Sequence, residues 1–294
     1  MGFTRLYEVG ITGKGVKVGV MDSGVYTEHP WLKDRVAVAR SAFDYEDEQD
    51  YFGHGTHVSG IIAKLAPDVS LYSYKILDSD GRGDLFTLIR GFDWAVNDGV
   101  DVINLSLGSP VNCCFSTIRL IHESAKDMGV FPIYAVGNFG EGKVACPAMI
   151  EDTLAVGSVD VDGSVADFTS RGPGCFFYRR PDTYAFGGGS KSCVISAWTP
   201  LSRRRPGMYA CVRGTSQAAP QVTAATALFI QAYREKYGVG PRYEDVKRVV
   251  ELATENNILR VDEMNRAVVN PVAQLLLSLA LLLVGEAVWR LRTR

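Results

Sequence analysis

Short apolar runs alternate with segments of helical spacing along most of the chain. The apolar runs end near Gly, Asp, Ser or Asn, which is typical of buried strands that lead into turns. The runs predicted as strands are 16–21, 69–77, 99–109, 129–138 and 153–160. The segments predicted as helices are 85–98, 118–128, 216–238 and 243–253. Because strands alternate with helices, we expect an α/β fold with a mainly parallel central sheet flanked by helices on both faces.

Polar side chains stand where these predicted strands end. Asp22 follows the first run, Ser106 lies near the end of the third, and Asn138 closes the fourth. In open parallel sheets, ligands bind in the crevice outside the carboxyl ends of the strands. The pattern therefore predicts a functional site at this edge of the sheet.

Residues 271–294 have a different pattern from the rest of the chain. An apolar run covers 272–284 and reaches Trp289 only if Glu286 is included, and three arginines follow. Spanning a bilayer takes about 20 mostly apolar residues, and a tryptophan followed by arginines suits a membrane interface with the basic end in the cytoplasm. We predict a membrane anchor at 271–294, with a docked helix or a disordered tail as alternatives. Residues 1–270 form the predicted globular domain.

Composition and charge narrow the possible partners. The chain has 294 residues, of which 47% are hydrophobic and 22% charged, and this is ordinary for a globular protein with a large core. Its net charge of -2 gives no basic footprint, so we expect no nucleic-acid partner, and we expect a monomer. The N-terminus lacks the apolar core of a secretory signal, which leaves an intracellular protein, a mature form or a fragment.

The six cysteines show no CxxC pair and no Cys/His spacing suited to zinc. Structural or oxidised thiols are therefore favoured over metal ligands, and we predict no metal site from them. Cys175 and Cys193 flank a loop rich in glycine and arginine, so they are the first candidates for a disulfide.

The chain contains the types of residue that a serine nucleophile requires around it. A serine hydroxyl reacts poorly at neutral pH unless a base lies within hydrogen-bond reach and a third group orients that base. The sequence offers Asp22 in "GVMDSG", two histidines in "GHGTHVSG" and Ser216 in "GTSQAAP". Taken singly, Asp22 could be a turn residue and Ser216 a helix N-cap. His54 and His57 could instead bind a metal, but no third ligand has an obvious spacing.

The motifs around these residues, and their order along the chain, resemble the subtilisin-like serine proteases. The motifs are "GVKVGVMDSGV", "HPWL", "GHGTHVSGIIA", "VINLSLG", "AVGNFG", "FTSRGP" and "GTSQAAPQVTA". The G-x-S-x-G elbow of the α/β-hydrolases is absent around Ser216. The resemblance implies a three-layer subtilisin-like fold. It also implies a serine endopeptidase that acts on polypeptides through an Asp-His-Ser triad, an acyl-enzyme and an oxyanion hole, with no required cofactor.

The resemblance also implies a role for each matching residue. By motif position, His54 is expected to be the general base and His57 a structural neighbour that packs behind it. Asp22 would orient the imidazole and stabilise the imidazolium, and Ser216 would attack the peptide carbonyl. Asn138 would supply the side-chain donor of the oxyanion hole, with the backbone N–H of Ser216 as the second donor.

Two segments are expected to bind substrate. The resemblance assigns peptide pairing to Ser106, Leu107 and Gly108, and a wall of the primary pocket to Ala135, Val136 and Gly137. A peptide that pairs as a strand gains main-chain hydrogen bonds whatever its sequence, so we expect broad specificity. Three positions depart from the family pattern and bear on pocket preference rather than on catalysis: Ser109, Val136 and Gln217.

Several alternatives stay open at this point. The acidic run 44–50 could hold calcium, which many subtilases bind, although a solvated charged loop is the favoured interpretation. A binding protein on the same scaffold, catalytically silent or inhibited by a partner, is the second functional hypothesis, and a metallohydrolase is a more distant third. The predicted anchor favours a membrane-anchored protein with an extracytoplasmic catalytic domain over an intracellular soluble one.

Overall fold

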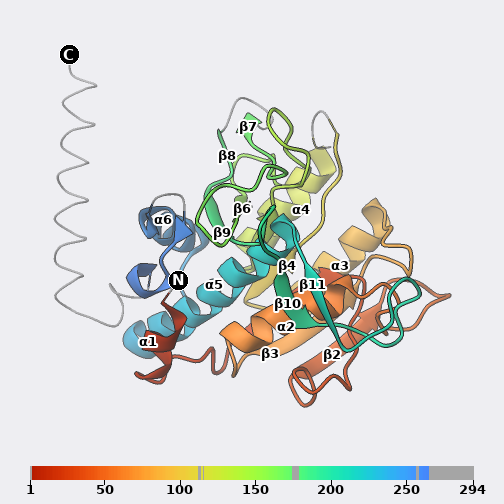
Figure 1. The fold of residues 1–294 in the computed structure, drawn as a ribbon. Coiled ribbons are helices and arrows are strands. Elements are labelled where there is room, and N and C mark those ends of the chain that lie inside the picture. The colour runs from red at the N-terminus through yellow and green to blue at the C-terminus, as the bar shows by residue number, and fades with distance from the viewer. Residues whose placement is uncertain (1, 112–113, 115, 174–178, 256–257, 265–294) are drawn as a thin grey trace.

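The computed structural model describes residues 2–111, 114, 116–173, 179–255 and 258–264. These residues form a nine-stranded sheet with the order β12-β13-β9-β6-β5-β4-β1-β3-β2 (Figure 1). Every neighbouring pair is parallel except β12 and β13. The strands are β1 (Lys17–Asp22), β2 (Val36–Ser41), β3 (Ser70–Lys75), β4 (Val102–Leu105), β5 (Phe131–Ala135), β6 (Leu154–Val159), β9 (Thr183–Phe186), β12 (Thr254–Glu255) and β13 (Ile258–Leu259). The predicted α/β class with a mainly parallel sheet is therefore confirmed.

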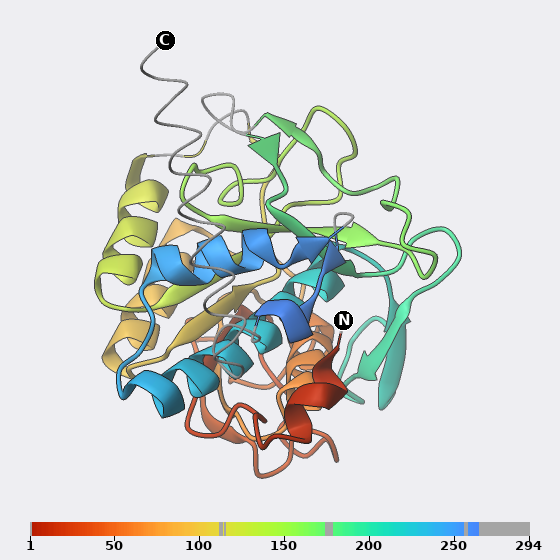
Figure 2. The same cartoon turned by 90° about the vertical axis from the view of Figure 1, so that its left-hand side faces the viewer.

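Helices cover both faces of this sheet and give the fold three layers (Figures 1 and 2). One apolar core lies between the sheet and α1, α2, α5 and α6, and the other lies between the sheet and α3 and α4. Along β1, Val18 and Val20 enter the first core and Met21 enters the second. The helices are α1 (Phe3–Tyr7), α2 (His54–Leu65), α3 (Leu85–Asn97), α4 (Ser116–Asp127), α5 (Thr215–Tyr237) and α6 (Tyr243–Leu252).

Two small antiparallel pairs complete the described structure. The pair β7 (Gly172–Pro173) and β8 (Arg179–Arg180) is short, whereas β10 (Val194–Ala197) and β11 (Tyr209–Val212) form a hairpin beside α2. Disulfides join Cys193 to Cys211 and Cys114 to Cys146. The expected Cys175–Cys193 bridge is therefore wrong, because Cys193 is bonded to Cys211 of β11.

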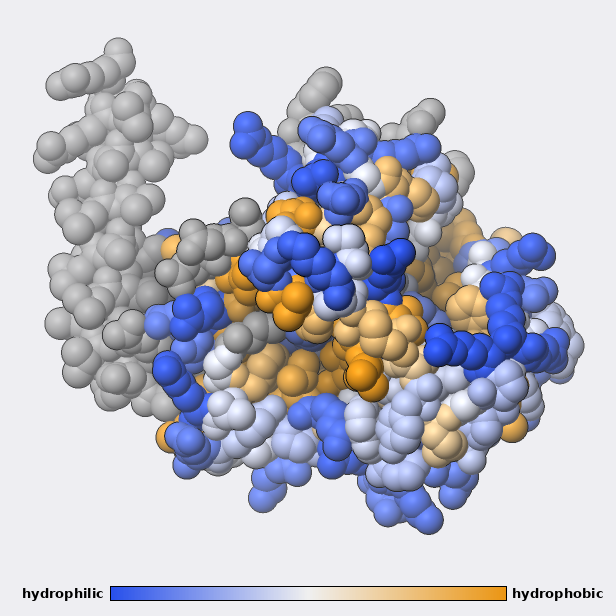
Figure 3. All heavy atoms as spheres, viewed as in Figure 1, coloured by the Kyte–Doolittle hydropathy of each residue, from blue (hydrophilic) through white to orange (hydrophobic). Residues whose placement is uncertain are grey.

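The described surface is mainly polar. Figure 3 shows hydrophilic side chains over much of one face, with apolar ones gathered toward its middle. Large apolar side chains that are exposed, such as Phe86 on α3 and Leu120 on α4, are scattered, as is common on protein surfaces. Within the described ranges, no helix is both long and apolar enough to cross a bilayer. The anchor predicted at 271–294 lies outside the described residues.

Candidate active site

Asp22 and His54 form a hydrogen-bonded pair at the carboxyl edge of the sheet. Asp22 is the last residue of β1 and is 1% exposed, and His54 is the first residue of α2. The Nδ1 atom of His54 lies 2.8 and 3.0 Å from the two carboxylate oxygens of Asp22. Because a carboxylate can only accept, this contact places the imidazole proton on Nδ1. Nε2 is then left to accept a proton from another group.

Glycine at position 55 allows α2 to approach β1 this closely. A Cβ atom on Gly55 would lie 2.2 Å from the carbonyl oxygen of Gly24 and 3.2 Å from the Cβ of Asp22. Gly53, which precedes the helix, has a φ of +107°, and a Cβ there would lie 2.3 Å from the Trp198 ring. The two glycines that flank His54 are therefore dictated by the backbone path and by the close packing around it.

Asp50 joins the end of β1 to the start of α2, and sequence reasoning missed it. Its side chain is completely buried, although the acidic run 44–50 was expected to be a solvated loop. Glu46 of the same run is also largely buried and pairs with Lys75 at 2.8 Å. The expectation is therefore wrong for these two residues. The donors to Asp50 are Ser23 Oγ at 2.9 Å, Phe52 N at 3.1 Å, Gly53 N at 2.7 Å, Thr56 N at 2.8 Å and Thr56 Oγ1 at 2.7 Å.

A signal for Asp50 was present in the sequence. An aspartate just before the start of a helix can accept hydrogen bonds from the N–H groups at that end, as Asp50 does with Gly53 and Thr56. The surrounding acidic residues concealed it, because composition cannot show which member of a charged run turns inward. Ser23 extends the junction, since its Oγ also accepts from Gly55 N at 2.9 Å.

Two carboxylates govern the charge state of His54. Burial lowers the pKa of His54, but the charge of Asp22, the hydrogen bond to it and the charge of Asp50 outweigh burial. The net result is a pKa above the ordinary value for histidine. The pKa of His57 on the same helix is lowered to about 4, mainly by burial and then by the nearby His54. His57 is therefore neutral at physiological pH, as a packing residue would be.

Ser216 lies in the first turn of α5 and is held by Ser106, the residue that follows β4. Its Oγ donates to the main-chain carbonyl of Ser106 at 3.0 Å, and the Ser106 Oγ donates to the carbonyl of Ser216 at 2.8 Å. Pro220 explains why the carbonyl of Ser216 has no donor within its own helix. As the residue four positions later, Pro220 lacks the N–H that would otherwise bond to it. The helix begins at Thr215, so Pro220 lies beyond its first turn.

A buried polar chain supports Ser106 from behind. Asn104, in β4, donates from Nδ2 to the Ser106 Oγ at 2.8 Å and accepts from the Thr223 Oγ1 at 3.0 Å. Thr223 lies in α5, so the chain ties the middle of that helix back to the strand. The position of Ser216 is therefore fixed by side chains from two elements.

Asn138 has a fixed amide orientation. Its Oδ1 accepts from Thr215 N at 2.9 Å and from Thr215 Oγ1 at 3.1 Å. Because the oxygen is engaged by the residue next to Ser216, the Nδ2 group is the end of the amide that remains to donate to another group.

One cavity brings the candidate residues together. His54, Ser216 and Asn138 all line it, as do five of the six residues expected to bind substrate: Ser106, Leu107, Gly108, Ala135 and Gly137. The sixth, Val136, is completely buried in the core and accepts from Ala145 N through its carbonyl. It therefore supports the pocket wall from behind rather than facing the cavity. The remaining apolar lining includes Leu85, Leu88 and Ile118.

The described residues contain no group of three or more His, Cys, Asp or Glu side chains suited to a metal ion. In the acidic run, the oxygens of Asp50 are engaged by N–H and O–H donors, and Glu46 is paired with Lys75. Calcium binding therefore stays an alternative without assigned ligands.

The family assignment rests on a match along most of the chain. Residues 13–267 match the family model described as "Subtilase family". The chain belongs to this family. Subtilisin BL of Lederbergia lenta is 38% identical to this subtilase over 232 residues, which cover 76% of this chain and 78% of that protein. Subtilisin E of Bacillus subtilis (strain 168) is 34% identical over 242 residues, which cover 78% of this chain and 58% of that protein.

Solved structures agree with this assignment. A structure titled as a lanthipeptide protease has a TM-score of 0.78 and 25% identity, covering 90% of this chain and 91% of its own. A cold adapted subtilisin-like serine proteinase has a TM-score of 0.70 and 28% identity, covering 84% of this chain and 85% of its own. This subtilase is a serine endopeptidase, and its substrates are polypeptides. The relatives named here give no support to a catalytically silent scaffold.

Proposed function

We propose that this endopeptidase cleaves peptide bonds through an acyl-enzyme at Ser216, with His54 as general base and Asp22 as the group that orients it. One observation carries the proposal. His54 is bound by Asp22 through Nδ1, and it shares a single cavity with Ser216 and Asn138. The Ser216 hydroxyl donates to Ser106 at present, so it must turn about its Cα–Cβ bond to reach His54 Nε2. Catalytic hydrogen bonds of this kind often tighten only when substrate binds.

In each step of the proposed reaction a named residue acts, and every proton that moves is accounted for. Ser216 Oγ attacks the peptide carbonyl carbon while its proton passes to His54 Nε2, and Asp22 stabilises the resulting imidazolium. The imidazolium gives the proton to the leaving amine as the C–N bond breaks, which leaves an ester on Ser216. A water molecule, deprotonated by His54, attacks that ester, and the proton returns to Ser216 as the acid product leaves.

Asn138 and the start of α5 are suited to stabilise the oxyanion. The Ser216 N–H belongs to the first turn of α5, where N–H groups have no intrahelical acceptor and the helix dipole favours negative charge. The Nδ2 of Asn138 adds a side-chain donor, and Thr215 fixes its direction. Two donors placed in advance of the reaction cost no reorganisation when the charge develops.

Replacing Asn138 by alanine should lower kcat by about 10² to 10³ and leave KM nearly unchanged, a magnitude taken from the equivalent change in subtilisin itself. The donor acts only on the charged intermediate, so substrate binding should not depend on it. Asn138→Asp keeps an oxygen acceptor for Thr215 but replaces the donor by a negative charge beside the oxyanion, so its kcat should fall at least as far. Steady-state kinetics on a peptide substrate measure both variants. A wild-type kcat in either one would contradict the oxyanion role.

The activity should rise with pH as His54 loses its proton. Because Asp22 and Asp50 raise the pKa of His54, the midpoint of the acid limb of kcat/KM should lie above pH 6.5. The acid limb should fit the loss of a single proton, because only neutral His54 can accept the hydroxyl proton of Ser216. Circular dichroism over the same range separates unfolding from titration. Two other buried histidines, His57 and His122 of α4, each have a pKa lowered to about 4. They lower the stability of the fold only as the pH falls from about 6.5 toward about 4, where the unfolded chain binds protons that the folded chain does not. A midpoint at or below pH 6.5 on folded protein would contradict the assignment.

The apolar lining supports a preference for peptides with apolar side chains before the cleaved bond. Leu85 and Leu88 of α3 face the same cavity as Leu107, next to the segment proposed to pair with the peptide backbone. Main-chain pairing tolerates many sequences, so the preference should be broad.

An extracytoplasmic position of the catalytic domain is the favoured location. The Cys114–Cys146 and Cys193–Cys211 disulfides support it, because such bonds persist mainly in oxidising compartments. Residues 1–270 as the peptidase domain, residues 271–294 as a membrane anchor, and a monomeric state complete the proposal and rest on the sequence pattern alone.

A further inference from the structure

The β10–β11 hairpin connects the two helices that carry His54 and Ser216. On one side it lies against α2, which begins at His54. On the other side, only residues 213–215 separate the end of β11 from Ser216. Any movement of the hairpin is therefore transmitted over a short distance to both catalytic side chains.

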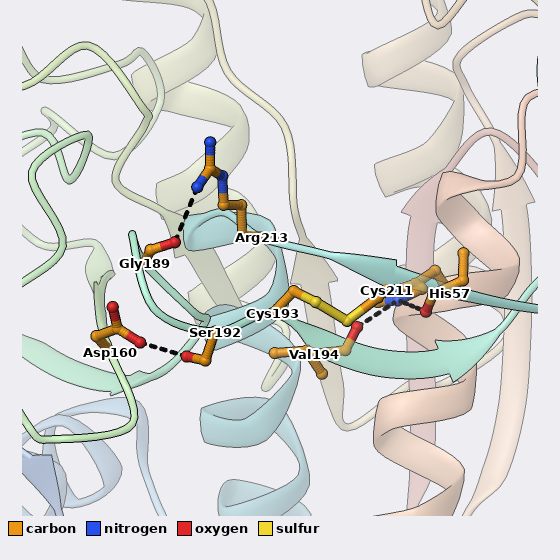
Figure 4. The surroundings of a disulfide bond; sticks show 9 residues. His57, Asp160, Gly189, Ser192, Cys193, Val194, Cys211 and Arg213 are labelled. Carbon is orange, nitrogen blue, oxygen red and sulfur yellow. Dashed lines mark hydrogen bonds between the residues drawn. A yellow bond between two sulfur atoms is a disulfide. The ribbon is translucent and has the colours of Figure 1, made fainter.

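His57 binds both strands of this hairpin (Figure 4). Its Nε2 lies 3.1 Å from the carbonyl oxygen of Val194 and 3.2 Å from that of Ala210. Its own carbonyl accepts from the Ser196 Oγ at 2.8 Å. Gly60 completes the contact, since a Cβ there would lie 2.5 Å from the Ser196 Oγ. Helix α2 is therefore tied to the hairpin by hydrogen bonds and by close packing that leaves no room for a side chain.

The Cys193–Cys211 disulfide closes the hairpin at the place where His57 binds it. Cys193 precedes Val194, and Cys211 follows Ala210, so each carbonyl that accepts from His57 is adjacent in sequence to a bridged cysteine. Figure 4 shows the sulfur bridge beside Val194 and His57. The bond keeps the two acceptors at a fixed separation, as a shared donor requires.

Contacts at the base of the hairpin attach it to the loop that follows β6. Asp160 accepts from the Ser192 Oγ and from Lys191 N, the latter at 2.8 Å. Arg213 donates to the carbonyl of Gly189 at 3.0 Å, as drawn in Figure 4. Gly214 N donates to the carbonyl of Gly187 at 3.0 Å. The segment that leads to Ser216 is thus anchored immediately before the nucleophile.

We propose that the disulfide-closed hairpin is a brace that sets the separation between His54 and Ser216, with His57, Cys193 and Cys211 as positioning residues. The inference rests on the proposed function, because it assumes that these two side chains react together. His57, Cys193 and Cys211 are absent from the residues that line the substrate cavity. The brace therefore acts on the rate of the chemical step and leaves peptide binding unchanged.

The test compares two disulfide variants by steady-state kinetics on one peptide substrate. Cys193→Ala/Cys211→Ala should lower kcat about 10- to 100-fold with KM within about twofold of wild type, since misplacing reacting groups by about 1 Å can cost about 10² in rate. Cys114→Ala/Cys146→Ala is the matched control, because Cys146 lines the cavity. Its KM should rise, and its kcat should fall less than in the first variant. A wild-type kcat in the first variant, or the same loss of kcat in both, would overturn the brace.

A pair of substitutions at His57 keeps the inference testable if the cysteine variant does not fold. His57→Gln retains an N–H donor for the two carbonyls, whereas His57→Leu has none. The glutamine variant should keep most of the wild-type kcat, and the leucine variant should lose it at constant KM. Equal kcat values in the two folded variants would overturn the inference. Fluorophosphonate labelling of Ser216 in the wild type tests the proposed function separately, because that reaction must occur before any change in kcat can be read.

Discussion

Replacing Ser216 by alanine should lower kcat by about 10⁶, the loss known for the equivalent change in subtilisin. Without the Oγ atom no ester can form, and the remaining rate would come from substrate binding and the oxyanion donors. The fold should persist, because the Oγ makes a single hydrogen bond, to the carbonyl of Ser106. Peptide hydrolysis and fluorophosphonate labelling measure the effect, and thermal unfolding checks the fold.

Ser106→Ala is the appropriate control for this change. It removes a neighbouring hydroxyl that binds the Ser216 carbonyl but leaves the nucleophile in place. This variant should still be labelled, with a smaller loss of turnover. If the Ser216→Ala protein were labelled at the same rate as wild type, another residue would be the nucleophile.

The second large effect is expected for Asp22→Asn, which should lower kcat by about 10⁴, as this carboxylate does in other triad proteases. The asparagine amide can donate toward His54 Nδ1, which would move the imidazole proton to Nε2. His54 could then no longer accept a proton from Ser216. The variant should also show a lower pKa for His54, because the charge of Asp22 and its hydrogen bond raise it. Kinetics across pH and the rate of Ser216 labelling measure both effects.

Asp50→Asn makes the same chemical change in the neighbouring buried carboxylate and is the matched control. Asp50 has no hydrogen bond to the imidazole in the described structure, so its folded variant should lose much less activity. Its free energy of unfolding should fall, because the amide nitrogen would face N–H and O–H groups that donate to the Asp50 carboxylate. Equal losses in the two variants would mean that packing, rather than the tautomer of His54, explains the effect.

Buried strands were predictable from the sequence because both of their faces are apolar. The pattern placed β1, β4, β5 and β6 within a few residues, since each is covered by helices on both sides. Strand β2 was missed because it is an edge strand that is only partly buried, and its Arg40 pairs with Asp98. Strand β10 was missed because its hydropathy does not follow its burial: apolar Ile195 is 67% exposed, whereas polar Ser196 is completely buried.

The site was predictable only where its residues carried motifs. The motif positions gave Asp22, His54, Asn138 and Ser216, and the structure brings all four to one edge of the sheet. Asp50 and the Cys193–Cys211 pair could not be obtained in this way. Their positions depend on contacts between segments far apart in the chain, and connectivity among six cysteines is not encoded in their spacing.

Pro220 has a consequence for attempts to move this catalytic apparatus into another protein. Pro220 has no N–H to give to its own helix, so the carbonyl of Ser216 is held from outside by the hydroxyl of Ser106, the residue after β4. A segment of α5 copied into a new scaffold without that strand would leave the carbonyl with no partner and the nucleophile without its support. Engineers who transplant the serine must therefore carry Ser106 and Pro220 with it as a single unit.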